Sequence, residues 1–450
     1  MDKLSYKFIR GLKIASLTVC LFGISRLYAD TSAPSFQAVD TYLKLSSADR
    51  QQKIEQVLSQ PLTERAILAI TFLASSELRE KYQDLWAKKA AYSSGIAIEN
   101  PVFSASVLPQ GQQSKVDISI EQDLIKWLIL PLQSRASDSQ FEANKLIFSE
   151  AILDRCSQVK KALIHYQASR LSLSIQSDFT EAEKATIELT QRQFDAGNIN
   201  ELQLKTQEVA YQDALLKQAE ADLLVREAKL QFQQMMGLGP TQTAWIVTGN
   251  LSEVLPLVPS INELDRLIDK QRPDLASLEY RVEAEKKRLD AQEWQARLGS
   301  VKAGIQYEQE FDGSQSIGPK IELGLPLFNQ GQQVGQEREA TVRQLSALLE
   351  SHRREAQYSA RRLLAQLEFE AIELKRSKTV LIPLHQRVTE LTQQHYNYML
   401  LGVFTLIQAK QEELKAQQNH IQHLKLFWST WAELEKEIGG DITQKERSHD

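Results

Sequence analysis

The sequence has little of what usually cross-links or interrupts a fold. Its 450 residues include 2 cysteines, 12 prolines and 18 glycines, and aromatic side chains make up 7%. Two cysteines allow at most one intramolecular disulfide, so a disulfide-built scaffold is excluded. The scarcity of helix breakers indicates a helix-rich chain. A hydrophobic content of 42% argues against a disordered one.

An excess of one charge sign is also missing. The chain carries 53 basic and 58 acidic side chains, a formal net charge of −5, and the signs alternate along the helical stretches. Such alternation is typical of solvated helix faces, whereas a nucleic-acid partner would call for a basic stripe. We therefore expect no nucleic-acid partner.

Signatures of catalysis are absent. The sequence has no nucleotide-binding glycine loop, no His-Glu-x-x-His zinc motif and no nucleophile elbow. His420 and His423 are spaced to share a metal on one helix face, but no third ligand is near them in sequence. A metal-binding periplasmic protein is therefore only an alternative. We predict that the protein is not an enzyme and has no cofactor, catalytic residue or metal site.

The longest hydrophobic run lies at the N-terminus. Basic residues precede an apolar run over 14–24, and Ala29 follows at a suitable distance, which predicts a secretory signal peptide over 1–29. Lipid attachment at Cys20 is the alternative. No later run reaches 18 apolar residues, so any insertion into a membrane would have to use strands.

Two very long helical stretches follow, over 132–194 and 333–401. At 1.5 Å per residue, each would reach roughly 90–100 Å, with a kink expected at Pro383 in the second. Each stretch ends near a glycine, Gly197 or Gly402, which we interpret as the helix C-cap, and a second helix follows. The chain thus reads as a two-fold internal repeat of helical hairpins.

A strand-like region precedes each long helix. Between 301 and 327, apolar residues alternate with polar ones on either side of a turn at Gly313 and Ser314, and 101–120 repeats the pattern more weakly. Strands of about ten residues with one apolar and one polar face fit a transmembrane barrel. Four strands cannot close a barrel in lipid, so a membrane interpretation requires several copies of the chain.

Four local patterns carry a family resemblance. They are Phe194-x-x-Gly197 with Leu202 and Leu204, Arg272-Pro273-Asp274-Leu275, Gly324 to Gly331, and Tyr398 to Gly402 with Leu406 and Ala409. In this order, the mature chain resembles the TolC-like outer-membrane efflux proteins. The stretch from Pro326 to Gly331 is most similar to their heavy-metal branch.

The resemblance implies a mainly α fold with a β-barrel part. Long helical hairpins would form a periplasmic α-barrel, and four strands would contribute to a trimeric transmembrane β-barrel. The homotrimer would sit in outer-membrane lipid and meet a periplasmic adaptor and an inner-membrane pump. It would be a passive conduit from the periplasm to the exterior for metal ions or small toxic compounds.

The implied division of the chain is as follows: signal peptide 1–29; N-terminal helices 30–100; first β-hairpin 101–131; first helical hairpin 132–238; equatorial segment and helices 239–299; second β-hairpin 300–328; second helical hairpin 329–438; C-terminal tail 439–450. Residues 241–260 and the tail would form a belt around the helices.

Three surfaces follow from the resemblance and the strand alternation. The periplasmic tips that dock the adaptor would contain Phe194, Gly197, Asn198, Leu202, Tyr398, Gly402 and Leu406. The candidate gate residues are Glu201, Thr405 and Gln408. The strands would face the lumen with Lys302, Gln306, Glu308, Lys320 and Glu322, and lipid with Val301, Ile305, Tyr307, Ile321, Leu323 and Leu325.

A periplasmic coiled-coil adaptor or tether that never enters the membrane is the alternative from another class. It accounts for the long helices. It leaves two amphipathic strand hairpins, placed symmetrically ahead of those helices, without a purpose.

Overall fold

The computed structural model describes residues 36–324, 330–440 and 442, so the predicted signal peptide, Cys20, Leu325 and most of the stretch from Pro326 to Gly331 lie outside it. The described residues fall into two compact units: those within Met1–Arg79, Ala151–Gln271 and Ala356–Asp450 form one, and those within Glu80–Glu150 and Arg272–Glu355 form the other. Within the described ranges, no helix is both long and apolar enough to span a membrane.

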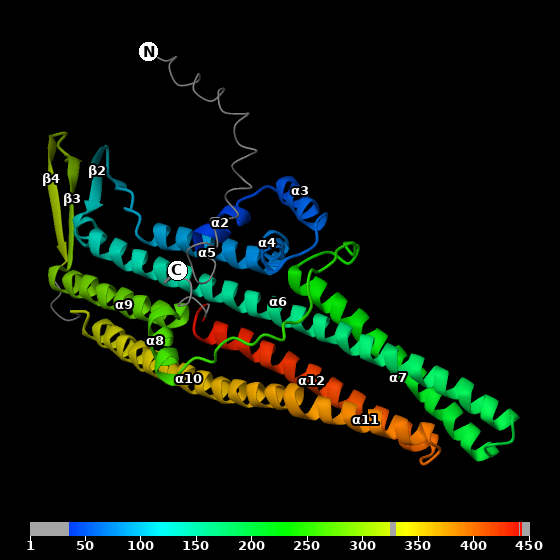
Figure 1. Cartoon of the computed structure of the whole chain (residues 1–450). Helices are drawn as coiled ribbons and strands as arrows, with labels where there is room; N and C mark the ends of the chain where they lie inside the picture. The colour runs from blue at the N-terminus through cyan, green and yellow to red at the C-terminus, as the bar shows by residue number, and fades with distance from the viewer. Residues whose placement is uncertain (1–35, 325–329, 441, 443–450) are drawn as a thin grey trace, which may run out of the picture. The chain divides into compact units, whose positions relative to one another are not determined.

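A four-stranded antiparallel sheet lies in the second unit (Figure 1). Its order is β1 (Val102–Gln110), β2 (Gln113–Asp123), β3 (Ser300–Gln309) and β4 (Gln315–Gly324). The β2–β3 ladder, which pairs Ile120 with Ile305, joins two hairpins that are far apart in sequence. Only glycine fits at Gly304, because a Cβ there would lie 2.0 Å from the carbonyl oxygen of Ile120. Both predicted strand hairpins are therefore confirmed, as parts of one sheet.

The first long helix begins earlier than predicted. Helix α6 spans Leu124–Asp195, so it starts at Leu124 and contains Pro131, which we had placed at the end of the strand hairpin. The Asp123 carboxylate accepts hydrogen bonds from the backbone N–H groups of Ile125 at 2.9 Å and Lys126 at 3.4 Å. This N-terminal cap starts the helix ahead of the proline.

The remaining long helices confirm two helical hairpins. Helix α7 spans Glu201–Met236 and pairs with α6, while α11 (Ile382–Asn397) pairs with α12 (Val403–Glu437) (Figure 1). Helix α10 (Gln332–Arg376) leads into α11 through a π-helical turn, Ser377–Leu381. Pro383 has no N–H to donate, and this wider turn, in which Ile382 N–H bonds to the Ser377 carbonyl, lies immediately before it.

The main core of the first unit brings short helices against the long ones. Its N-terminal helices are α2 (Phe36–Leu43), α3 (Ser47–Leu58) and α4 (Glu64–Ala74), and α5 (Ser76–Gly95) continues into the second unit. Phe232 of α7 is fully buried and packs edge-on against Trp245 at a ring distance of 5.4 Å. This core attaches the start of the 239–260 segment to the helices.

The Arg272-Pro273-Asp274-Leu275 pattern has a structural explanation. Helix α8 ends at Gln271 (Ile261–Gln271), and α9 (Pro273–Leu298) begins with Pro273 in its first turn. The Arg272 guanidinium binds both carboxylate oxygens of Asp274, at 2.9 and 2.7 Å. The four residues therefore fix the start of α9.

Candidate functional site: the two-faced sheet and the hairpin tips

One face of the sheet is apolar and open. The strand register places side chains from all four strands on it, and seven of them are between 52% and 75% exposed. Those seven are Phe103, Val107, Ile120, Ile305, Ile317, Ile321 and Leu323. An exposed apolar face of this extent is unusual for a protein surrounded by water and marks a contact surface.

The opposite face carries ion pairs and hydrogen bonds between strands. Lys320 of β4 pairs with Glu121 of β2 at 2.6 Å, and Lys302 of β3 pairs with Glu322 of β4 at 2.8 Å. Two further contacts join β2 to β3: Lys115 to Glu308 at 2.5 Å, and Gln306 to Asp117 at 2.9 Å. These polar groups satisfy one another across the strands. Lys302 and Glu322 lie directly opposite each other, so this charge pair favours the pairing of β3 with β4.

The predicted alternation of faces holds for β3 and β4. The five residues assigned to the lumen all lie on the polar face, and the described residues assigned to lipid all lie on the apolar one. The sequence interpretation missed the contribution of β2, where Lys115, Asp117 and Glu121 alternate with apolar residues. In β1 the pattern weakens, because Val102 and Leu108 share the polar face.

The turn between α6 and α7 has a polar, well-capped form. Gly197 adopts the left-handed conformation at φ 73°, and the Asn198 N–H donates to the Gln193 carbonyl at 2.9 Å. Asn200 then caps α7, since its side chain accepts from the Gln203 N–H while the Gln203 side chain accepts from the Asn200 N–H. The predicted glycine C-cap is confirmed here.

The turn between α11 and α12 has the same backbone but different residues. Met399, not Gly402, holds the left-handed position at φ 58°, and the Leu400 N–H donates to the His395 carbonyl at 2.9 Å. The prediction that Gly402 caps the preceding helix is therefore wrong. Gly402 is extended, with φ −79° and ψ 158°, and begins α12 without a side-chain cap.

The two turns belong to the same unit, and their helices touch near the tips. The Gln193 side-chain amide donates to the Tyr396 hydroxyl at 3.1 Å. Several apolar tip residues are open to solvent: Leu202 at 74%, Tyr398 at 78% and Met399 at 94%. The sequence interpretation placed the helix C-cap at Gly402 and not at Met399, because methionine rarely adopts positive φ.

The candidate gate residues have different counterparts in the two halves of the chain. Glu201, Thr405 and Gln408 are all exposed. Aligning the two turns at Gly197 and Met399 matches Glu201 with Val403, which is buried, and Thr405 with Gln203. The two halves thus present different chemistry at equivalent positions.

The histidine pair on α12 is engaged differently from the arrangement a metal would need. His423 Nδ1 lies 2.7 Å from the carboxylate of buried Glu370 on α10. His420 lines a cavity. In the part of the chain that the structure describes, no three His, Cys, Asp or Glu side chains come together to hold a metal ion.

Solved structures with the same arrangement exist. No protein-family model matches the sequence, and no curated protein matches it. A membrane protein from Pseudomonas aeruginosa superposes with a TM-score of 0.71 at 16% identity, over 84% of this chain and 92% of that one. The outer-membrane channel OprN superposes with a TM-score of 0.67 at 16% identity, over 92% and 94%. This chain has the fold of the outer-membrane channels.

A third neighbour, CusC, has been studied for conformational changes that accompany folding and transmembrane channel formation. It superposes with a TM-score of 0.69 at 16% identity, over 84% of this chain and 92% of that one. The outer-membrane channel fold therefore extends over most of the chain. The fold expected from the TolC-like resemblance is confirmed.

Proposed function

We propose that the protein is the outer-membrane channel subunit of a tripartite efflux or export system. It acts as a passive homotrimeric conduit from the periplasm to the exterior, with a large periplasmic portion. The observation that carries the proposal is the four-stranded sheet with one apolar face and one ion-paired face. The shared outer-membrane channel fold supports it.

The sheet needs further copies of the chain to be stable in lipid. Strands β1 and β4 are its outer strands, and each pairs along one side only. In hydrocarbon every backbone N–H and C=O must find a partner within the protein. Three copies, each with four strands, would pair β1 of one with β4 of the next and close a barrel. The apolar face would then meet lipid, and the polar face would line the lumen.

The helices also present surfaces that a neighbouring copy would cover. Along α7, large apolar side chains recur every seventh residue and are between 50% and 74% exposed: Leu202, Val209, Leu216, Leu223 and Leu230. We call these five residues the α7 stripe. A seven-residue repeat of this kind is the seam by which one helix packs along another.

A second apolar surface on α10, the π-helical turn and α11 offers the complementary half. Its exposed members are Phe369, Ile372, Val380, Leu384, Val388 and Leu391. If the α7 stripe of one copy packs on this surface of the next, the contact is heterologous and repeats around a ring. A closed trimer satisfies both surfaces and the strand edges together.

The hairpin tips are the proposed docking site for the periplasmic adaptor, which in turn contacts an inner-membrane pump. Exposed Leu202, Tyr398 and Met399 supply apolar contact area there. Glu201 is the proposed gate residue of the first hairpin, with Thr405 and Gln408 in the second. We propose metal ions or small toxic compounds as cargo, on the resemblance of residues 326–331.

The deciding experiment is the mass of the mature protein by light scattering, after extraction of outer-membrane fractions with detergent. We expect a protein mass of three chains, recovered only with detergent. Planar-bilayer conductance of that species, with Glu201→Gln compared against wild type, would then test the gate. A soluble monomer or dimer in the periplasmic fraction would rule out the conduit and favour the coiled-coil adaptor.

A further inference from the structure

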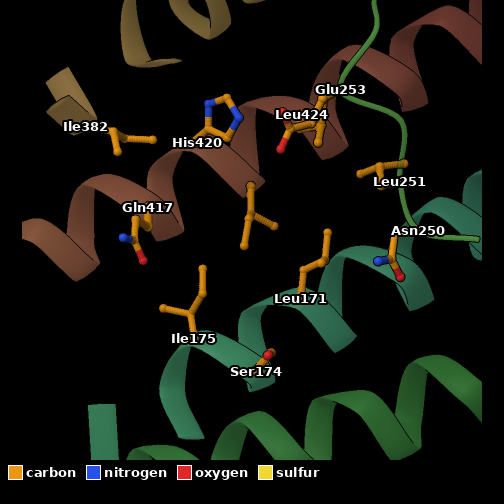
Figure 2. A pocket seen from close by; sticks show the side chains of 11 residues that line it. Leu171, Ser174, Ile175, Asn250, Leu251, Glu253, Ile382, Gln417, His420 and Leu424 are labelled. Atoms are coloured by element: carbon orange, nitrogen blue, oxygen red, sulfur yellow. The ribbon is translucent and has the colours of Figure 1, made fainter. Parts of the chain in front are cut away.

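A cavity of about 340 Å³ lies beneath residues 249–254, which we call the strap (Figure 2). The strap runs from α6 toward α12, and Leu251 points from it into the cavity. Leu171 and Ile175 enter from α6, and Leu424 enters from α12. Every lining residue belongs to the first unit.

The strap is fixed on both sides of Leu251. Before it, the Gln167 amide on α6 donates to the Gly249 carbonyl at 3.3 Å. After it, the Trp428 indole N–H on α12 donates to the Ser252 carbonyl at 2.8 Å, and Lys378 of the π-helical turn pairs with Glu253. Because three separate elements hold the roof in place, the cavity is pre-formed, as ligand sites usually are.

The lining defines what the cavity would accept. Its apolar walls are Leu171, Ile175, Leu251, Ile382, Ile421 and Leu424, and its uncharged polar groups are Ser174, Asn250, Gln417 and His420. The one carboxylate, Glu253, already pairs with Lys378. An apolar body with a few polar groups around it is the usual composition of a small-molecule site.

His420 contributes an uncharged imidazole. Burial lowers its pKa, although the nearby Glu253 carboxylate acts in the opposite direction. Lys378 and His423 act in the same direction as burial. The ring nitrogen Nδ1 is buried, and no hydrogen-bond partner for it occurs in the described part of the chain. A cationic imidazole would therefore be costly here, and a charged ligand would find no free counter-charge.

We propose that this cavity binds a small uncharged molecule with an apolar body and one hydrogen-bonding group. The bound molecule touches α6, α12, the strap and Ile382, the first residue after the π-helical turn. Binding therefore stabilises the strap against the helices next to the π-helical turn. The inference goes beyond the conduit proposal and does not depend on it, since none of the residues proposed to form contacts between copies lines the cavity.

The test uses 5-fluoroindole as the probe, observed by fluorine NMR with the full chain in detergent. Its planar apolar ring carries one N–H donor and no charge. We expect saturable binding to the wild type. Ser174→Trp places an indole at the mouth of the cavity and should weaken binding at least about tenfold. Ser351→Trp is the matched control, because Ser351 is also an exposed helical serine but lies outside the cavity.

Two further arms make the result decisive. Leu251→Trp fills the cavity from the strap instead of from α6, and it should weaken binding of 5-fluoroindole to a similar extent. It replaces Ser174→Trp in the test if that variant fails to fold. The anionic analogue 5-fluoroindole-2-carboxylate should bind at least about tenfold more weakly than 5-fluoroindole. Equal uptake by wild type and both filled variants would mean detergent partition only and would overturn the site. Equal binding of the anion would overturn the assigned ligand class.

Discussion

The two halves of the chain build the same turn from different residues. In the first, Gly197 takes the left-handed position and Asn200 caps the next helix with Gln203. In the second, Met399 takes the left-handed position and Gly402 provides no side-chain cap. The pairing of two antiparallel helices therefore fixes the turn even where the local sequence opposes it. The second tip should open more readily, since both differences lower its local stability.

The helices that lead to the tips differ as well. Helix α6 runs unbroken through 72 residues, whereas the second half is interrupted by the π-helical turn before Pro383. The strap pairs with that turn through Glu253 and Lys378. The halves thus share a plan, but among the described long helices only the second half has a π-helical turn, and the strap is attached to that turn. We expect movements of the helices to concentrate at this π-helical turn.

The largest expected effect concerns the sheet, where the two halves should behave alike. Phe103→Arg in the first half and Ile305→Arg in the second each place a charge on the apolar face. Each should cost about 2–4 kcal/mol if that face meets lipid, and should abolish recovery of assembled trimer from the outer membrane. Gln306→Arg is the control on the polar face and should assemble normally. If the sheet faces water, all three variants will be tolerated.

Substitutions on α7 and at the matching positions of α12 should differ in their effect on trimer stability. Aligning the turns matches Val209, which is 61% exposed, with the exposed polar residue Gln411 on α12. Val209→Lys should weaken the trimer by about 2 kcal/mol per interface, because a buried valine is lost between copies. Gln411→Lys should have little effect. Trimer dissociation on dilution, followed by light scattering, measures both. If both variants dissociate equally, the α7 stripe is not the contact between copies.

Reciprocal substitutions at the left-handed positions should change the local stability of the two tips in opposite directions. Gly197→Ala should destabilise the first tip by about 1 kcal/mol from backbone strain alone, since a Cβ there would meet no other atom within 4 Å. Met399→Gly should stabilise the second tip by a similar amount. Hydrogen exchange of the tip amides reports each effect locally. A change of the same sign in both would contradict the assigned turn geometry.

The smallest effect concerns a buried carboxylate found in the first half. Glu183 on α6 is 3% exposed, and its burial raises its pKa, partly offset by the hydrogen bond from Gln207. The folded state therefore holds the proton more tightly than the unfolded chain does. Stability from this group is present below the ordinary glutamate pKa and is lost as pH rises through the raised value.

Replacing this carboxylate should remove that pH dependence. Glu183→Gln should be more stable than wild type at neutral pH, by about 1 kcal/mol, and should change less between pH 4 and 8 in thermal unfolding. Glu181→Gln, at an exposed position of the same helix, should match the wild type. A destabilised Glu183→Gln would indicate that the ionised carboxylate is needed.

Much of the fold could be predicted from local sequence. The alternation of Ile305, Tyr307, Ile321 and Leu323 with polar neighbours predicted two strands with distinct faces, and the register bears this out. The start of α6 could not be predicted, because Pro131 is the stronger local signal and the capping by Asp123 depends on the backbone geometry at the strand end. The left-handed backbone of Met399 could not be predicted, because it is imposed by the helices on either side.

The sequence by itself determined the repeat, the long helices and the two-faced strands, because these depend on periodicity and on residue types that are neighbours along the chain. Only the tertiary structure decided that β2 pairs with β3, that Gln193 meets Tyr396, and that the strap covers a cavity between α6 and α12. These contacts join residues that are far apart in sequence. Their formation depends on packing across the whole unit, which no local pattern specifies.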